Sequence, residues 1–132
     1  MTELIPRLFI GNWHEARDRH HRDGLHVVTV AVDSEYVGDA HFKLVDGPGN
    51  SKEEFEAAVD HTCRVYNNME RVLVHCVGGR SRSAAVIVAA AVKLTGRPMC
   101  DVYDELLRKH DGTGLGARIH PYLSMLLLET LK

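Results

Sequence analysis

The stretch between residues 71 and 95 constrains the fold more than any other part of the chain. Residues 71–75, Arg-Val-Leu-Val-His, have the continuous apolar composition of a strand that is covered on both faces. Residues 83–95 have the composition of a helix that is apolar on all sides, and Gly96 and Pro98 follow in the order typical of a helix C-terminus. A helix without a polar face must be surrounded by other elements. The sequence therefore predicts a buried strand that leads, through a loop with two glycines, into a central helix.

Strands and helices alternate through the middle of the chain. Short apolar runs predict further strands at residues 8–10, 27–32 and 41–45. Capping residues and helical spacing predict helices at residues 12–24, 51–68 and 99–110 and from Pro121 onward, with a glycine-rich connector at 111–116. This alternation predicts an α/β fold: a compact, open, mostly parallel central sheet of about four to five strands with helices on both faces. A chain of 132 residues suits one core, so we expect residues 1–132 to form a single domain.

Charge and composition exclude several classes of protein. The chain has 16 Lys and Arg against 18 Asp and Glu, a net charge of −2, which gives no support to generic nucleic-acid binding. The longest stretch without a polar residue, 84–92, has nine residues, well short of the roughly 18 needed to span a membrane, and no export signal opens the sequence. Cys63, Cys76 and Cys100 have unrelated spacings, which favours free thiols over a disulfide framework. We therefore expect a cytoplasmic protein in a reducing compartment without a membrane partner; a monomer is favoured, although the sequence does not determine the oligomeric state.

The loop between the buried strand and the central helix has the composition of an anion site. Open parallel sheets place their ligands at this kind of strand-to-helix junction. Two adjacent glycines allow the loop to turn its backbone N–H groups towards one point, and the positive end of the helix adds to them. Arg82 supplies a planar fork that can hold two oxygens of a tetrahedral anion. We expect a phosphate group to be bound by Val77, Gly78, Gly79, Arg80, Ser81 and Arg82.

Cys76 begins this loop and is the candidate nucleophile. Concentrated N–H donors and positive potential favour the thiolate form of a cysteine, which can attack bound phosphorus. Ser83 is placed to donate a hydrogen bond to the sulfur when it leaves. Asp46, in a Gly-Pro turn, is the best candidate for the proton donor to the leaving oxygen, with Asp33 as the rival acid. His75 is expected to hold the loop in place, with its ring nitrogens bonded to backbone groups.

The pattern His-Cys-x5-Arg-Ser, with Gly79 three residues after the cysteine, resembles the protein tyrosine phosphatase superfamily, in particular its compact dual-specificity branch. Segments 5–11 and 118–121 are similar to the first strand and last helix of that family. The resemblance implies that Cys76 forms a phosphocysteine, Arg82 binds the phosphoryl oxygens, Ser83 assists departure of the thiolate and Asp46, 30 residues before the cysteine, is the acid. It also implies phosphotyrosine or phosphoserine/threonine in proteins as substrate, and no metal or other cofactor.

Two positions depart from the family pattern. Gly78 stands where alanine is common, and Tyr122 follows Pro121 where asparagine is usual, so support of the loop from that side is open.

Other interpretations remain open from the sequence. A catalytically weak phosphate-binding or scaffold protein of the same fold is one, and a phosphatase acting on phosphoinositides or on RNA 5′ phosphates is another. A sulfur-transferring rhodanese-like domain also places a cysteine in an anion loop, but the spacing between the cysteine and the arginine argues against it. His14, His20 and His21 could suggest a metal site; without a completing ligand at a familiar spacing, they are interpreted as part of a solvated helix face.

Overall fold

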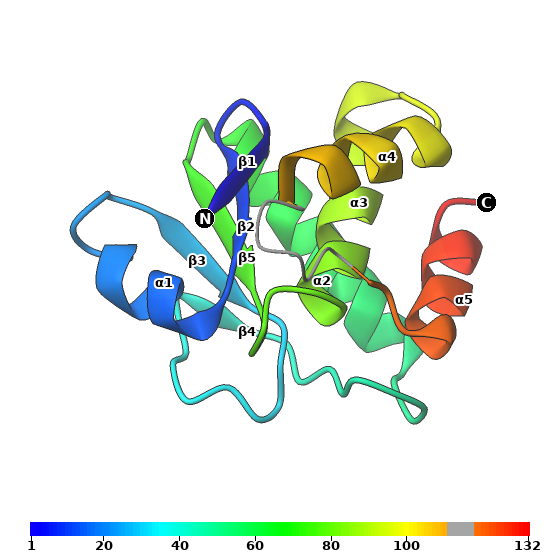
Figure 1. The fold of residues 1–132 in the computed structure, drawn as a ribbon, viewed down its shortest axis with the longest axis horizontal. Helices are drawn as coiled ribbons and strands as arrows, with labels where there is room; N and C mark the ends of the chain where they lie inside the picture. Colours follow the sequence, from blue (N-terminus) through cyan, green and yellow to red (C-terminus); the bar gives the residue numbers. More distant parts are fainter. Residues whose placement is uncertain (111–117) are drawn as a thin grey trace.

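The computed structural model describes residues 1–110 and 118–132 and contains a five-stranded sheet with the strand order β1-β2-β5-β3-β4 (Figure 1). Strand β5 is the central strand, is parallel to both of its neighbours and is buried at all four positions. Only β1, at one edge, is antiparallel to its neighbour. The mostly parallel sheet of four to five strands is therefore confirmed. The strands are Thr2–Ile5 (β1), Leu8–Gly11 (β2), His26–Thr29 (β3), Ala40–His41 (β4) and Val72–His75 (β5).

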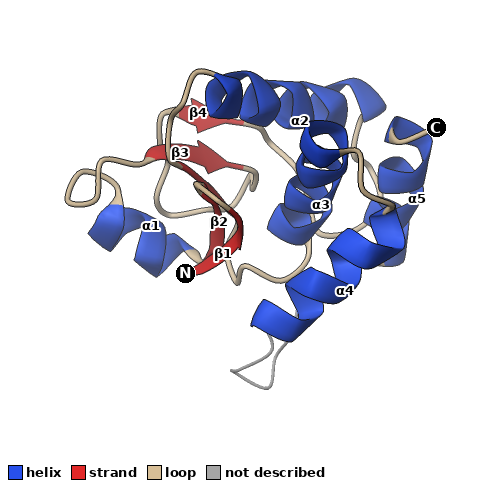
Figure 2. Ribbon diagram, turned by 90° about the horizontal axis from the view of Figure 1, so that it is seen from above, coloured by secondary structure: helices blue, strands red, loops and turns tan. Residues whose placement is uncertain are grey.

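Helices cover both faces of the sheet, but unequally. Figure 2 shows α1 on one side of the strands and α2, α3, α4 and α5 on the opposite side. Helix α3 lies in the middle of that larger layer and packs against α2, α4, α5 and the sheet. The helices are Trp13–Arg19 (α1), Lys52–Asn67 (α2), Arg82–Thr95 (α3), Met99–His110 (α4) and Pro121–Thr130 (α5).

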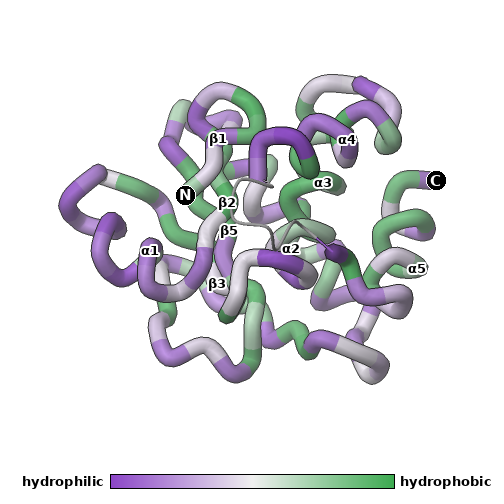
Figure 3. Tube along the Cα trace, in the orientation of Figure 1, coloured by the Kyte–Doolittle hydropathy of each residue, from purple (hydrophilic) through white to green (hydrophobic). Residues whose placement is uncertain are grey.

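The burial of α3 follows from its side chains. Its first ten residues, from Arg82 to Ala91, are all buried, and most of them are alanine or valine, which are small enough for sheet and helices to approach closely. Figure 3 shows this helix as largely hydrophobic, whereas α1 is largely hydrophilic. Helix α1 covers a smaller apolar cluster formed by Phe9, Ala16, Leu25, Val27 and Leu73. The predicted central helix is thus confirmed.

Two predicted strands need correction, and one strand was missed. The strand expected over 27–32 ends at Thr29, and Val32 is about half exposed. The strand expected over 41–45 pairs only through Ala40 and His41, because the Lys43 backbone N–H donates to the side chain of Glu54 instead of to a neighbouring strand. Strand β1 was not predicted at all. The connector expected at 111–116 lies outside the described residues.

Candidate active site

The carboxyl end of β5 and the start of α3 border a pocket of about 470 Å³. This is the strand-to-helix junction at which the sequence predicts an anion site. Loops that follow β3 and β4 complete the wall with two aspartates, and Arg118 enters from the segment before α5. The lining residues are Asp33, Asp46, Cys76, Val77, Gly78, Arg80, Ser81, Arg82 and Arg118.

Cys76 lies at the wall of this pocket with only 2% of its surface exposed. Its Sγ atom is 3.2 Å from the Oγ atom of Ser83, which is fully buried in the first turn of α3. A hydroxyl at this distance can donate a hydrogen bond to a thiolate. The structure thus brings Cys76 and Ser83 together across seven residues of the chain.

His75, the last residue of β5, holds the start of the loop through both ring nitrogens. Nδ1 lies 2.9 Å from the Cys76 carbonyl oxygen, which can only accept, so Nδ1 carries the proton. Nε2 lies 2.7 Å from the Thr29 hydroxyl, which itself accepts from the Gly38 backbone N–H and can therefore donate to Nε2. Burial lowers the pKa of His75 to about 4, in agreement with a neutral ring. The expectation of two backbone partners was half right, because the second partner is a threonine side chain.

The turn at Gly79 is fixed by close contact with the end of β2. Gly79 has a φ of +71°, and a Cβ atom placed there would lie 2.7 Å from the Gly11 carbonyl oxygen. The Gly79 carbonyl oxygen lies 2.9 Å from Nε2 of His110, at the end of α4, and can accept a hydrogen bond from it. Gly79 is therefore buried against β2, and it does not belong to the pocket lining given above.

The N-terminus of α3 is buried without a side-chain cap among the described residues. Ser81 is the N-cap residue, but its hydroxyl accepts a hydrogen bond from the His120 backbone N–H at 2.9 Å instead of from the helix. The first N–H groups of a helix lack partners within the helix, and a buried, uncapped start suits an anion. Support of the loop from the segment around Tyr122 thus comes from the backbone of His120, just before Pro121. The Tyr122 side chain itself is half exposed.

Arg82 is buried and uses one end of its guanidinium to hold neighbouring loops. Its Nη1 atom donates to Asp33 Oδ1 at 2.5 Å and to the Leu44 carbonyl oxygen at 3.2 Å. Hydrogen bonding from Arg82 lowers the pKa of the Asp33 carboxyl group below its usual value. The Nε and Nη2 atoms have no partner in the described part of the chain, so two donors in fork geometry remain for a ligand.

Asp46 is exposed and lies in the pocket lining, and within the described residues it makes no hydrogen bond or ion pair with Cys76 or Arg82. Its loop is pinned by Asn50, whose side chain accepts from the Val45 backbone N–H and donates to the Val45 and Gly47 carbonyl oxygens. The two candidate acids thus differ: Asp33 is tied to the buried arginine, and Asp46 is not.

Sequence reasoning missed three residues that shape this site. Arg118 lines the pocket, His110 bonds to the loop, and Thr29 holds His75. The segment Arg-Ile-His-Pro at 118–121 carries the family likeness, and its arginine is the sequence signal for a further anion contact.

The histidines near α1 do not gather around a metal. His14 and His21 are exposed as expected, but His20 is buried and bonds to Tyr36 and Asp39, so its assignment to a solvated face was wrong. Within residues 1–110 and 118–132, no three His, Cys, Asp or Glu side chains form a cluster that could hold a metal ion. None of the helices in these ranges is long and apolar enough to span a bilayer.

Comparison with known proteins identifies the family. No family model matches the chain. Dual specificity protein phosphatase 22 of Xenopus tropicalis is 30% identical over 105 residues, covering 72% of this chain and 49% of the relative. Human dual specificity protein phosphatase 1 is 27% identical over 117 residues, covering 82% of this chain and 32% of the relative. The crystal structure of human DUSP28 superimposes with a TM-score of 0.82 and 20% identity, over 99% of this chain and 95% of that one.

The chain belongs to the dual-specificity branch of the cysteine-based protein tyrosine phosphatase superfamily. It spans about half or less of the length of these two curated dual-specificity phosphatases. The superposition on DUSP28 confirms the protein tyrosine phosphatase-like fold over nearly the whole chain.

Proposed function

We propose that this chain hydrolyses phosphomonoesters of tyrosine, serine or threonine in proteins through a phosphocysteine intermediate. The observation that carries the proposal is the Cys76 thiol, 3.2 Å from the Ser83 hydroxyl, in a pocket that also holds Arg82 and the uncapped start of α3. The names of the curated relatives support protein substrates. Activity on whole proteins is part of the proposal, because the chain spans only part of those relatives.

In the first step, the Cys76 thiolate attacks the phosphorus atom of the bound phosphomonoester. A bond forms between Sγ and phosphorus while the bond from phosphorus to the substrate oxygen breaks, and Asp46 donates its proton to that oxygen. The free Nε and Nη2 donors of Arg82 and the N–H groups at the start of α3 hold the equatorial oxygens. Phosphoryl transfer depends mainly on this positioning and electrostatic stabilisation.

In the second step, water hydrolyses the phosphocysteine. Asp46, now ionised, takes a proton from the water as its oxygen attacks phosphorus, and the bond between phosphorus and sulfur breaks. The Ser83 hydroxyl donates a hydrogen bond to the departing thiolate. Inorganic phosphate leaves, and the thiolate and the protonated Asp46 are restored. These residues supply both proton transfers, so the scheme requires neither a metal nor another cofactor.

The thiolate must stay reduced for this chemistry. All three cysteines are free, and Cys76 is the buried one. We therefore place the protein in a reducing compartment such as the cytoplasm, and expect oxidants to inactivate it reversibly by sulfenic acid formation at Cys76.

The decisive test is turnover of an aryl phosphate such as para-nitrophenyl phosphate by the wild type and by Cys76→Ser. We expect the substitution to abolish turnover, because a serine hydroxyl is a far weaker nucleophile than a thiolate, while vanadate binding stays measurable. Cys63→Ser, at a half-buried cysteine outside the pocket, is the matched control and should keep its rate. Retained turnover in Cys76→Ser would contradict the mechanism.

A substrate panel tests the class of phosphomonoester. Phosphotyrosine and phosphothreonine peptides, a phosphoinositide and an RNA with a 5′ phosphate should be compared by kcat/KM. We expect the peptides to lead; a higher value for the lipid or the RNA would reassign the substrate while leaving the phosphocysteine chemistry in place.

A further inference from the structure

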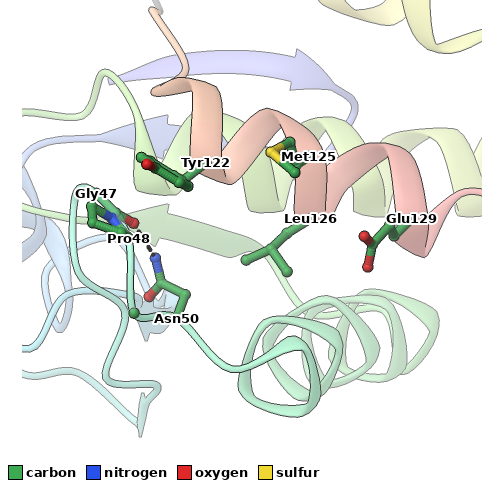
Figure 4. Close-up of a pocket in the computed structure, with 8 residues that line it drawn as sticks. Gly47, Pro48, Asn50, Tyr122, Met125, Leu126 and Glu129 are labelled. Atoms are coloured by element: carbon green, nitrogen blue, oxygen red, sulfur yellow. Dashed lines mark hydrogen bonds between the residues drawn. The ribbon is translucent and has the colours of Figure 1, made fainter.

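A second, smaller groove lies next to the proposed active site and is not used by the mechanism. It has a volume of about 160 Å³ and lies between the loop that follows Asp46 and one face of α5. Figure 4 shows Tyr122 close to Gly47 and Pro48 at one end of the groove, and Glu129 at the other end. The lining residues are Gly47, Pro48, Gly49, Asn50, Tyr122, Met125, Leu126 and Glu129.

The groove and the active-site pocket share one loop. Asp46 lines the pocket, and the next residue, Gly47, lines the groove, so the two sites meet within one peptide unit. The three hydrogen bonds of Asn50 hold this loop in shape. A peptide whose phosphorylated side chain enters the pocket can therefore continue along the edge of the groove.

The helix side of the groove is apolar and open to solvent. Tyr122 is 51% exposed and Met125 is 58% exposed, and Leu128 on the same helix is 51% exposed outside the groove. The described residues contain six exposed large hydrophobic side chains, and these three lie on one short helix. Exposed apolar surface concentrated in this way marks an interaction site.

The charge of the lining residues changes sign from the active-site pocket to the far end of the groove. Three arginines, Arg80, Arg82 and Arg118, outnumber the two aspartates in the pocket lining, whereas Glu129 ends the groove and has no ion-pair partner in the described ranges. Tyr122 and Glu129 are seven residues apart in α5, a rise of about 10 Å, which about three residues of extended peptide span. A peptide that follows this path meets positive charge first, then apolar surface, then a carboxylate.

We propose that this groove is the subsite for the segment that flanks the phosphorylated residue, and that it selects an apolar residue followed by Lys or Arg. This inference rests on the proposed function. The apolar side chain would pack against Met125 and Tyr122, and the basic side chain would reach Glu129. A volume of about 160 Å³ is the space of about five water molecules, enough for one aliphatic side chain.

The test compares kcat/KM for phosphopeptides that carry Leu-Lys, Leu-Glu, Gly-Lys or Gly-Glu beside the phosphorylated residue, on either side of it. On one side we expect Leu-Lys to exceed Gly-Glu by about tenfold or more, in line with discrimination in small apolar pockets. Met125→Ser should remove the preference for leucine, whereas Leu128→Ser, the matched control on the same helix, should keep it. Para-nitrophenyl phosphate, which is too small to reach the groove, reports the catalytic loop separately.

Charge reversal tests the far end of the groove. Glu129→Lys should turn the preference for Leu-Lys into one for Leu-Glu, while Glu70→Lys makes the same change in net charge at an exposed site outside the groove and should leave the preference unchanged.

Several results would overturn the subsite. Equal kcat/KM for all four peptides, equal losses in Met125→Ser and Leu128→Ser, or an unchanged charge preference in Glu129→Lys would each do so while aryl phosphate turnover still supports the phosphatase. A phosphoinositide or RNA substrate that surpasses every peptide would also overturn it. Absence of aryl phosphate turnover in the wild type would overturn the phosphatase itself, and the subsite with it.

Discussion

Two aspartates line the pocket of the proposed nucleophile, and their surroundings assign them different tasks. Hydrogen bonding from Arg82 lowers the pKa of Asp33, so Asp33 is ionised at neutral pH and is a poor proton donor. Asp46 lies on the loop that Asn50 pins and makes no such bond in the described residues. Asp46→Asn should therefore lower kcat for alkyl phosphates, whose leaving groups are poor, by about 100-fold or more. For an aryl phosphate with a good leaving group the loss should be several times smaller, and an equal loss for both would exclude Asp46 as the acid.

Asp33 acts through Arg82 and should show a different pattern. Because Nη1 of Arg82 is held by Asp33 and Leu44, the fork made by Nε and Nη2 stays directed for a ligand. Asp33→Asn should lower kcat/KM by about tenfold, by the same factor for good and poor leaving groups, since an arginine held in place supports both reactions alike. Asp33→Glu should recover part of the loss. A loss that grows as the leaving group becomes poorer would identify Asp33 as the acid in place of Asp46.

At the scale of elements, the loop between β5 and α3 keeps its shape through one glycine and not through its neighbour. A Cβ atom at Gly79 would lie 2.7 Å from the Gly11 carbonyl oxygen in a left-handed backbone conformation, whereas at Gly78 the nearest contact is a flexible Arg80 carbon at 3.6 Å. Gly79→Ala should therefore lower the free energy of unfolding by about 2 kcal/mol or more and displace the loop from β2. Gly78→Ala, the matched control, should change it by less than about 0.5 kcal/mol. Urea denaturation measures both, and equal effects would contradict the proposed role of the contact with β2.

An element could be predicted from the sequence when the residues that determine it lie within the element or next to it. The predicted segment from β5 through the loop to α3 agrees with the structure because the apolar strand, the paired glycines and the apolar helix are all encoded within 25 residues. Strand β1 escaped prediction because the run Thr-Glu-Leu-Ile is short. It pairs with β2 only because the chain reverses direction in the turn through Arg7, which has a φ of +72°. Strand β4 was overextended because an alternating pattern carries no information about the Glu54 side chain that captures the Lys43 N–H.

At the scale of the whole molecule, the contacts that complete the site join distant parts of the chain. Asp33 and Arg82 are 49 residues apart, Thr29 and His75 are 46 apart, and Gly79 and His110 are 31 apart. No spacing rule in a single sequence pairs such residues. The nucleophile and its loop could therefore be predicted from the sequence. The hydrogen bonds that hold Arg82 and the second partner of His75 could be identified only from the three-dimensional structure.

The buried ring of His75 links this fold to pH. Burial holds the pKa of His75 at about 4 in the folded chain, against 6.5 for an exposed histidine, so the unfolded chain binds the proton more tightly. Above pH 6.5 the ring is neutral in both states and the free energy of unfolding keeps its full value. As the pH falls towards 4, protonation of the unfolded chain lowers the free energy of unfolding by a total of roughly 3 kcal/mol. Protonation also forces Nε2 to donate, which breaks its hydrogen bond from Thr29.

The buried His75 ring should make the free energy of unfolding depend on pH. Denaturant titrations of the wild type between pH 7 and pH 4 should show a loss of free energy of unfolding larger by roughly 3 kcal/mol than in His75→Asn, which lacks the titrating ring. His14→Asn, at an exposed histidine, is the matched control and should follow the wild type. An NMR titration of the folded protein should place the His75 ring near 4. A ring that titrates near 6.5 in the folded state, or equal pH dependence in wild type and His75→Asn, would contradict the neutral, buried histidine that this structure assigns to the base of the loop.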